Sequence, residues 1–264
     1  MSQPLVLGVI PARIGSERLA RKPLHPIAGR PLIEWVWRRV QAFSCLDAVV
    51  VATDSEEIAS VCRRAGATVE MTLATHPSGT DRVAEVATRS PYRGFDVIVN
   101  IQGDEPLIGE DQVRAAASLV KEGWDVGTVA TPVRSLEAWR SPAVVKVVRR
   151  DDGGALYFSR APIPHLRDGE PSADDLASSC YLRHLGVYAY APDALRRWVA
   201  LPPSPLERIE RLEQLRALEA GLSIGVAVVD HAEGGVDTYD DARRIEARLL
   251  DAADGIIFND VESE

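Results

Sequence analysis

Cysteine and long apolar runs are both scarce in this sequence. Cys45, Cys62 and Cys180 are the three cysteines in 264 residues, and they lie too far apart for a typical metal site. We therefore expect reduced thiols in the core of a cytoplasmic protein. No apolar stretch approaches the roughly 20 residues that a membrane helix needs. The first residues also lack a basic segment before their short apolar run, so we expect neither a signal peptide nor membrane insertion.

An excess of positive charge is missing as well. The 39 acidic residues outnumber the 30 basic ones, which gives a net charge of −9. This charge argues against a general nucleic-acid binder, because phosphate backbones are held by cations spread over a broad face. A local cation cluster can still bind a small anion. One such cluster follows the first apolar run, residues 5–10, and contains Arg13, Arg18, Arg21 and Lys22.

Apolar, strand-like segments alternate with segments of helical periodicity along most of the chain. This alternation is typical of βαβ units and a mainly parallel sheet. The length suits one large α/β domain, or one domain with an insertion. We expect strands at residues 5–10, 48–53, 68–71, 96–101, 126–132 and 223–229, and helices at 31–43, 55–65, 80–90, 111–121, 205–220 and 239–250.

The pattern changes in the middle of the chain. Residues 144–160 form two alternating segments around Asp-Asp-Gly-Gly, which predicts a β-hairpin. Residues 181–190 read as a further strand. We therefore predict an α/β core of residues 1–132 and 204–252, with a smaller antiparallel insertion at 133–203. The acidic residues 253–264 are expected to be a frayed tail.

The basic loop after the first predicted strand has the composition of a phosphate site. It contains neither a Walker motif nor the Gly-x-Gly-x-x-Gly fingerprint. Gly15 and Ser16 can offer backbone N–H groups, while Arg13 and Lys22 supply positive charge. This combination suits a polyphosphate and a leaving pyrophosphate. The alternative is a solvated basic loop.

Two acidic segments are candidates for a divalent-cation site. "NIQGDEP" (residues 100–106) places Asp104 directly after a buried strand, and "GGVDTYDD" (residues 234–241) offers Asp237 after two glycines. Open α/β sheets bind ligands at the carboxyl ends of their strands. Two carboxylates there would leave Mg²⁺ open positions for phosphate oxygens and water. The alternatives are a turn residue for Asp104 and a helix N-cap for Asp237.

Other segments give weaker signals. "HPSGTDR" (residues 76–82) can read the edge of a nucleobase, but an ordinary helix-capping loop has the same composition. Arg160, His184 and Tyr188 can hold the carboxylate and hydroxyls of a polar acceptor, although a His or Tyr on a strand is more often structural. Glu213 and Gln214 have no local feature that singles them out from an amphipathic helix.

Taken together, these segments resemble the 3-deoxy-manno-octulosonate cytidylyltransferase family, also called CMP-KDO synthetase. The resemblance runs from Val9 to about Asp241 and keeps the order of the family's motifs. The motifs are "IPARIGSERLARKPL", "VATDS", "HPSGTDRVAEV", "NIQGDEPLI", "ALYFSRAPIP", "YLRHLGVYAY", "SPLERIERLEQLR" and "GVDTYDD".

The resemblance implies transfer of CMP from CTP to the anomeric hydroxyl of 3-deoxy-D-manno-octulosonate (KDO), with release of pyrophosphate, for lipopolysaccharide biosynthesis. It also implies a nucleotide-binding α/β domain with an inserted dimerisation domain, working as a homodimer with Mg²⁺. Arg13, Lys22, Asp104 and Asp237 are then the expected catalytic residues. By motif position, the resemblance implies triphosphate binding by Arg13, Ser16 and Lys22 and recognition of cytosine by Ser78, Gly79 and Thr80. Asp104 is a further nucleotide-binding residue and holds magnesium together with Asp237. The residues implied to contact the sugar acid are Arg18, Gln102, Arg160, His184, Tyr188, Glu213 and Gln214.

The sequence departs from the family pattern in the phosphate loop, where Ala20 and Arg21 replace the usual Pro and Gly. This change alters loop stiffness by about 1 kcal/mol but keeps Lys22 in register. Two other functions remain open at this point. One is a cytidylyltransferase for a different acid, such as 8-amino KDO, sialic acid or a phosphonate. The other is a non-catalytic nucleotide sensor.

Overall fold

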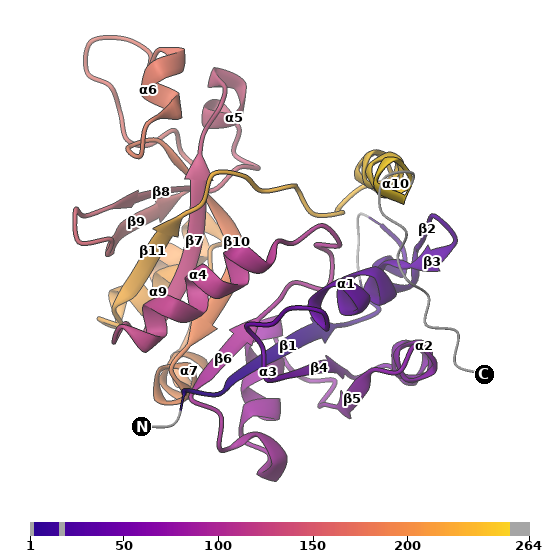
Figure 1. Cartoon of the computed structure of the whole chain (residues 1–264). Coiled ribbons are helices and arrows are strands. Elements are labelled where there is room, and N and C mark those ends of the chain that lie inside the picture. The colour runs from indigo at the N-terminus through magenta and orange to yellow at the C-terminus, as the bar shows by residue number, and fades with distance from the viewer. Residues whose placement is uncertain (1–2, 16–18, 254–264) are drawn as a thin grey trace.

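A mainly parallel, nine-stranded sheet forms the centre of the computed structural model, which describes residues 3–15 and 19–253 (Figure 1). The strand order is β11-β7-β10-β6-β1-β4-β5, and β8 and β9 extend the sheet beside β10. β10 runs antiparallel to its neighbours β6 and β7, whereas β6, β1, β4 and β5 are mutually parallel. The strands are β1 (Val6–Ala12), β4 (Ala48–Thr53), β5 (Thr68–Met71), β6 (Val97–Asn100), β7 (Val126–Pro132), β8 (Lys146–Arg149), β9 (Ala155–Ser159), β10 (Leu182–Tyr190) and β11 (Ile224–Val228).

Both faces of this sheet are covered by helices, as the near-continuous apolar strands require. Successive residues of β1 alternate between the faces, so that Leu7 and Val9 join one core cluster while Val6 and Ile10 join the other. The first cluster also takes residues from α3 (Gly79–Ala87), α7 (Pro192–Ala200) and α9 (Gln214–Glu219), and the second from α1 (Leu32–Val40), α2 (Glu56–Arg64) and α4 (Glu110–Lys121).

The remaining elements lie at the two ends of the sheet. The long helix α10 (Tyr239–Ala253) packs over the small hairpin of β2 (Pro26–Ile27) and β3 (Arg30–Pro31), where Leu19, Ile27 and Ile245 share a separate apolar cluster (Figure 1). At the other end, α5 (Leu136–Arg140) and α6 (Ala173–Ala177) rise beyond the sheet beside β8 and β9. None of the helices in the described ranges has the length and apolarity needed to cross a bilayer.

Most predicted elements are confirmed because their burial patterns are strong. The strands at 48–53, 68–71 and 126–132 have the predicted bounds, and Ser55 caps α2 by accepting a hydrogen bond from the Ile58 N–H. The hairpin around Asp-Asp-Gly-Gly is the antiparallel pair β8–β9. The prediction of core thiols is wrong for Cys180, which is exposed, whereas Cys62 is buried. The predicted tail lies almost wholly outside the described residues.

The predicted helix at 205–220 is wrong in one respect, because the structure divides it into α8 (Pro205–Glu210) and α9. Arg211 stands between them with φ +52°, in the left-handed region, and so interrupts the helical hydrogen bonds. The side chain of Arg160 donates to the carbonyls of Glu210 and Arg211. A partner distant in sequence therefore binds the carbonyls that a continuous helix would use.

The region at 133–203 also differs from the expected separate insertion, because its last strand lies inside the main sheet. β10 pairs with β6 and β7, and its residues face both cores: Val187 and Ala189 join one cluster, and Tyr188 and Tyr190 the other. A strand that is apolar on both faces must be covered on both, and the centre of the sheet provides that cover.

Candidate active site

The loop after β6 is held tightly against β1 at the carboxyl edge of the sheet. A Cβ atom added to Gly103 would lie 2.9 Å from the Pro11 carbonyl oxygen and 3.3 Å from Ile33 Cδ1. Such a contact with backbone is too short for any side chain, so glycine is required there. This close approach fixes the position of the next residue, Asp104.

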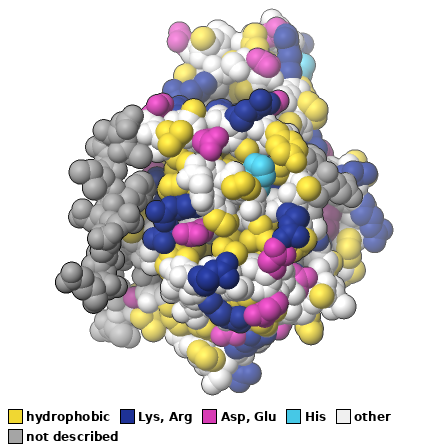
Figure 2. Space-filling view, turned by 90° about the vertical axis from the view of Figure 1, so that its right-hand side faces the viewer, with side chains coloured by type: hydrophobic (Ala, Val, Ile, Leu, Met, Phe, Trp, Pro, Cys, Tyr) yellow, Lys and Arg dark blue, Asp and Glu magenta, His cyan; other side chains and the backbone are white. Residues whose placement is uncertain are grey.

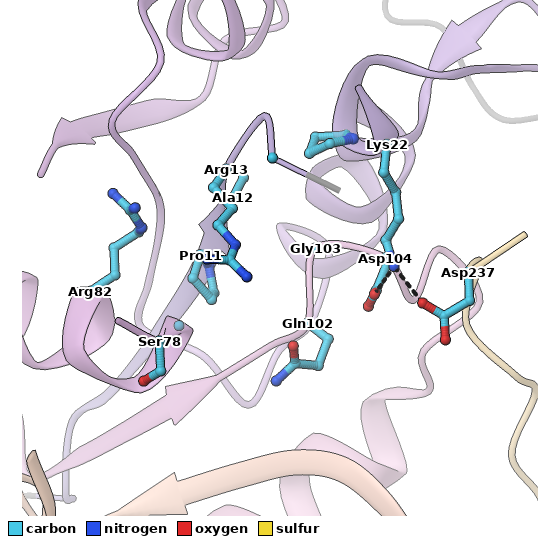
Figure 3. Close-up of a pocket in the computed structure, with 13 residues that line it drawn as sticks. Pro11, Ala12, Arg13, Lys22, Ser78, Arg82, Gln102, Gly103, Asp104 and Asp237 are labelled. Atoms are coloured by element: carbon cyan, nitrogen blue, oxygen red, sulfur yellow. Dashed lines mark hydrogen bonds and ion pairs between the residues drawn. The ribbon is translucent and has the colours of Figure 1, made fainter. Parts of the chain in front are cut away.

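Lys22 joins the two acidic segments. Its Nζ donates to Asp104 Oδ2 and, at 2.8 Å, to Asp237 Oδ1 (Figure 3). Burial alone would lower the pKa of Lys22, but the two carboxylates outweigh this effect and raise it above its ordinary value. The ammonium group is therefore charged, and two carboxylates 133 positions apart in the sequence, Asp104 and Asp237, converge on one point.

The local structure around Asp237 decides against the capping alternative. The side chain of Thr238 accepts a hydrogen bond from the Asp241 N–H at 3.2 Å, and Asp241 in turn accepts one from the Thr238 N–H at 3.0 Å. Thr238 thus caps α10, while Asp237 precedes the cap and contacts Lys22. The Val236 N–H donates to the Asp104 carbonyl at 2.8 Å, which holds the second acidic segment against the first.

The basic loop has an unusual backbone at the departure from the family pattern. Arg21 adopts φ +53°, a conformation that favours glycine, directly before the short 3-10 helix that carries Lys22. Its guanidinium contacts Glu57 at the surface. Arg21 stands where the family that this chain resembles usually has glycine, and it adopts the left-handed conformation that glycine favours.

A cavity of about 930 Å³ lies at this edge of the sheet. Lys22, with Asp104 and Asp237, lies at one end of the cavity. Ser78 and Arg82 lie at the other end, and Arg13 lies between the two ends in Figure 3. The predicted residues that line it are Arg13, Gly15, Lys22, Ser78, Gly79, Gln102, Asp104 and Asp237. The basic loop thus faces a cavity that also carries the acidic segments.

The Ser78 end of the cavity is built by the start of α3. Ser78 caps this helix by accepting from the Asp81 N–H, and its hydroxyl donates to Asp81 Oδ2 at 2.6 Å. Gly79 lies against the side chain of Pro11, and Thr80 is buried behind the loop. The segment therefore caps a helix and also lines the cavity. Its recognition of a nucleobase stays a prediction.

Arg82 is a cavity residue that the sequence analysis did not single out. Its side chain is buried, donates to Thr72 Oγ1 and lies 3.4 Å from Asp54 Oδ1. An arginine four positions after Ser78 returns to the same side of α3, next to the cavity. This spacing within the quoted motif is the signal that could have identified it.

The residues predicted to contact the sugar acid are only partly brought together. Gln102 lines the cavity and donates to the Gly186 carbonyl at 3.3 Å. Five other residues of this group, all within the described part of the chain, do not line the cavity: Arg160, His184, Tyr188, Glu213 and Gln214. Ser16 and Arg18 lie outside the described residues. The contacts of this group with a substrate stay predictions.

His184 and Tyr188 have the packing of structural residues. The His184 ring lies against Phe158 and Tyr188, and its Nε2 is 3.0 Å from Thr128 Oγ1. Burial lowers the pKa of His184 to about 3, so the ring is neutral near pH 7. It can therefore offer a hydrogen bond at most, and no charge, to an anionic acceptor.

Glu213 lies behind the cavity, in contact with the α3 cap. Its Oε1 is 3.3 Å from Ser78 Oγ and accepts a hydrogen bond from Trp198 Nε1 at 3.1 Å. Burial raises the pKa of Glu213 above its ordinary value. Glu213, which is predicted to bind the sugar acid, therefore contacts Ser78 of the segment that is predicted to recognise cytosine.

The two carboxylates fit the donor set of a magnesium site. Asp104 and Asp237 both form ion pairs with the same cation, the Lys22 ammonium group. Within the described residues, no group of three or more His, Cys, Asp and Glu side chains is arranged to hold a metal ion. Mg²⁺ commonly binds one or two carboxylates and completes its shell with water and substrate phosphates, which is the kind of site that these two side chains can form.

Comparisons with known proteins identify the family. A cytidylyltransferase family model matches residues 7–224. The 3-deoxy-manno-octulosonate cytidylyltransferase of Gemmatimonas aurantiaca is 52% identical over 90% of this chain and 92% of its own length. The enzyme of that name from Syntrophotalea carbinolica is 47% identical over 92% of this chain and 98% of its own length.

Solved structures give the same result. A CMP:2-keto-3-deoxy-manno-octonic acid synthetase complexed with CTP superposes with a TM-score of 0.85 at 36% identity, covering 94% of this chain and 99% of the other. A 4-diphosphocytidyl-2C-methyl-D-erythritol synthase from Anaerococcus prevotii, at 15% identity and a TM-score of 0.60, covers 94% of this chain and 99% of its own and shares the fold alone.

The mainly parallel sheet and the charged cavity at its carboxyl edge are therefore those of a nucleotidyltransferase. Within that class, the chain belongs to the 3-deoxy-manno-octulosonate cytidylyltransferase branch of the cytidylyltransferase family.

Proposed function

We propose that this chain transfers CMP from CTP to the anomeric hydroxyl of KDO and releases pyrophosphate, as a step in lipopolysaccharide biosynthesis. One observation carries the proposal: Lys22, Asp104 and Asp237 converge at one end of a cavity whose other end is formed by Ser78 and Gly79. The relatives' shared name and the CTP complex of a similar protein support the choice of substrates.

The chemistry is an in-line displacement at the α-phosphorus of CTP. A bond forms from the acceptor oxygen to the α-phosphorus, the bond from that phosphorus to pyrophosphate breaks, and the hydroxyl proton leaves to solvent. The acceptor carboxylate and the triphosphate are both anions. Unit charges about 4 Å apart repel by roughly 4 kcal/mol at an effective dielectric constant of 20, so cations must offset this cost.

The residues of the chain supply that compensation. Arg13 and Lys22 line the cavity and can neutralise the triphosphate and the charge that grows on pyrophosphate. We propose Ser78, Gly79 and Thr80 for the base, with Arg160 for the acceptor carboxylate. Catalysis then rests mainly on positioning and charge stabilisation, as in other phosphoryl transfers.

We propose Mg²⁺ as the cofactor, held by Asp104 and Asp237. Bound there, it would neutralise phosphate charge and lower the pKa of the acceptor hydroxyl. The observation in favour is that these two carboxylates meet around a single positive charge at the edge of the sheet. Lys22 can exchange its carboxylate partners for phosphate oxygens when the nucleotide binds.

We further propose a homodimer that uses the inserted antiparallel region, and a cytoplasmic location, where CTP is available. The β8–β9 hairpin at the edge of the sheet, with the helices α5 and α6 beyond it, offers a surface for a second copy (Figure 1). Leu156 on β9 is 53% exposed, so a second copy bound at this edge would bury it.

A pyrophosphate-release assay with CTP and a panel of acceptors tests the proposal. The panel is KDO, 8-amino KDO, sialic acid and a phosphonate, each with and without Mg²⁺. We expect release with KDO that depends on Mg²⁺. Release only with another acid would overturn the acceptor and leave the transfer chemistry standing. Nucleotide binding without product from any acid would indicate the sensor instead.

A further inference from the structure

Lys146 on β8 is a fully buried lysine that the proposed chemistry does not use. Its relative exposure is 0%, and its Nζ donates to three main-chain carbonyls: Ser141 at 2.8 Å, Val144 at 2.6 Å and Arg160 at 2.6 Å. An ammonium group has three N–H donors, so these three oxygens satisfy it completely. Burial and the nearby Arg160 charge lower the pKa of Lys146, whereas the Glu210 carboxylate acts in the opposite direction. The three carbonyl oxygens provide the direct hydrogen bonds that a buried ammonium group needs.

The same three oxygens belong to a junction of four chain segments. Arg160 Nη1 donates to the Pro142 carbonyl at 2.9 Å, and Arg160 Nε donates to the Glu210 carbonyl at 2.8 Å. The Glu210 carboxylate accepts from the Arg160 N–H at 2.9 Å and from Ser159 Oγ at 2.6 Å. Loop 141–144, β8, the end of β9 and the α8–α9 turn are thus tied together.

Residues proposed to bind the acceptor lie in this junction or directly after it in the chain. Arg160 is one of its members, and Glu213 and Gln214 follow Arg211 of the α8–α9 turn by two and three residues. The nucleotide residues Arg13, Lys22 and Ser78 lie on other elements. A disturbance of the junction should therefore change the acceptor side of the site before the nucleotide side.

We propose that Lys146 is a positioning residue for the acceptor: by holding loop 141–144 to the backbone of Arg160, it fixes the geometry from which Arg160, Glu213 and Gln214 meet the sugar acid. This inference rests on the proposed function, because it takes these three residues as acceptor contacts. A side chain that served packing alone would not need a buried charge, and methionine would fill a similar space at lower cost.

Steady-state kinetics on Lys146→Met and Lys146→Gln test the proposal. Methionine removes all three donors, whereas glutamine keeps an amide with two N–H groups. We expect KM for the acceptor to rise at least tenfold in Lys146→Met and by less in Lys146→Gln, with KM for CTP within twofold of the unchanged protein. Thermal unfolding of each variant, measured in parallel, reports stability separately.

The matched control is Arg149→Met on the same strand, whose side chain donates to the Val226 carbonyl at 3.0 Å, outside the junction. We expect its acceptor KM to be unchanged. Should Lys146→Met not fold, Lys146→Gln, which keeps two N–H donors, replaces it as the test. A lower melting temperature with acceptor KM within threefold in the folded variants would overturn the proposal, as would equal increases in KM for both substrates.

The acceptor panel keeps the two proposals apart. If the panel selects an acid other than KDO, the proposed acceptor fails, and the same variants measured with that acid still decide the role of Lys146. If KDO is the acceptor and Lys146→Met binds it normally, the positioning role fails while the proposed function stands.

Discussion

At the scale of single residues, one ammonium group organises the proposed active site. Lys22 has 15% of its side chain exposed, against 30% for Asp104 and 44% for Asp237, so the cation is the most buried member of the three. The two carboxylates beside this partly exposed ammonium group stabilise its charge. Removal of one carboxylate therefore changes the electrostatics of the site without removing core packing.

Replacement of Asp104 by Asn should lower kcat/KM by at least about 100-fold, in line with the roughly 3 kcal/mol that one electrostatic group contributes in a transition state. The side chain keeps its size, so far-UV circular dichroism and the melting temperature should change little. Asp240→Asn is the control, since Asp240 is 88% exposed and pairs with Arg243 on α10. Near-normal pyrophosphate release by Asp104→Asn would contradict the role assigned to Asp104.

A second group of residues holds the loop that leads to Ser78. The Glu85 carboxylate accepts hydrogen bonds from the Leu73 N–H and from Arg89, and it contacts His76. Burial alone would raise the pKa of Glu85, but the Leu73, His76 and Arg89 contacts outweigh it and lower the pKa to about 2. Because the folded pKa is depressed, Glu85 stabilises the fold fully above its unfolded value, and this contribution is lost as the pH falls toward 2.

Glu85→Gln should therefore reduce the free energy of unfolding by about 1–2 kcal/mol at pH 7. The difference from the unchanged protein should shrink between pH 4.5 and pH 2, the interval between the ordinary and the folded pKa. Urea unfolding at several pH values measures both effects. Glu56→Gln serves as control, because Glu56 is 72% exposed and an exposed ion pair contributes little. A pH-independent difference would show that the Glu85 charge is not responsible.

At the scale of elements, the contact between the β6 loop and β1 sets the position of Asp104. Gly103 lies so close to the Pro11 carbonyl that a side chain there must displace backbone. Parallel pairing of β1 with β6 brings the two carboxyl ends together, and the glycine allows the final approach. The loop therefore depends on one residue that makes no contact with substrate in the proposed mechanism.

Gly103→Ala should destabilise the fold by about 1–3 kcal/mol, the usual cost of overpacking, and lower activity by displacing Asp104. Urea unfolding and pyrophosphate release measure the two effects. Gly94→Ala is the matched control, because an added Cβ there meets nothing within 4 Å. Equal stabilities for Gly103→Ala and Gly94→Ala would show that the β6 loop can move away from β1 freely.

At the scale of the whole molecule, surface charge is mixed rather than concentrated. On the face that Figure 2 shows, basic and acidic side chains alternate with hydrophobic ones, and no broad basic field covers the described part of that face. The net charge of −9 agrees with this distribution. The described part of this face therefore lacks the broad field of cations that holds a nucleic-acid backbone.

The proposed homodimer makes a prediction at this scale. Sedimentation equilibrium should give about twice the chain mass of 28.7 kDa. Leu156→Glu on the exposed face of β9 should shift the equilibrium toward the monomer, because a charge buried at an interface without a partner is unfavourable. Leu73→Glu is the control, since Leu73 is 61% exposed and lies on the loop near α3. A monomer at micromolar concentration would contradict the proposed assembly.

The sequence by itself determined the elements whose signals are local. Apolar runs bounded by polar residues predicted β4, β5 and β7 to the residue, and Ser55 predicted the start of α2, because burial and capping depend on near neighbours in the chain. The order of motifs also indicated the family and pointed to Lys22, Asp104 and Asp237.

Tertiary structure alone decided what depends on partners far along the chain. It ended α8 at Arg211, whose carbonyl Arg160 binds, and it placed β10 inside the main sheet, where both of its faces are covered. It also brought Arg82 to the cavity and enclosed Lys146 among three carbonyls. Contacts of this kind join residues that no local pattern relates, so only the packed fold can show which side chains meet.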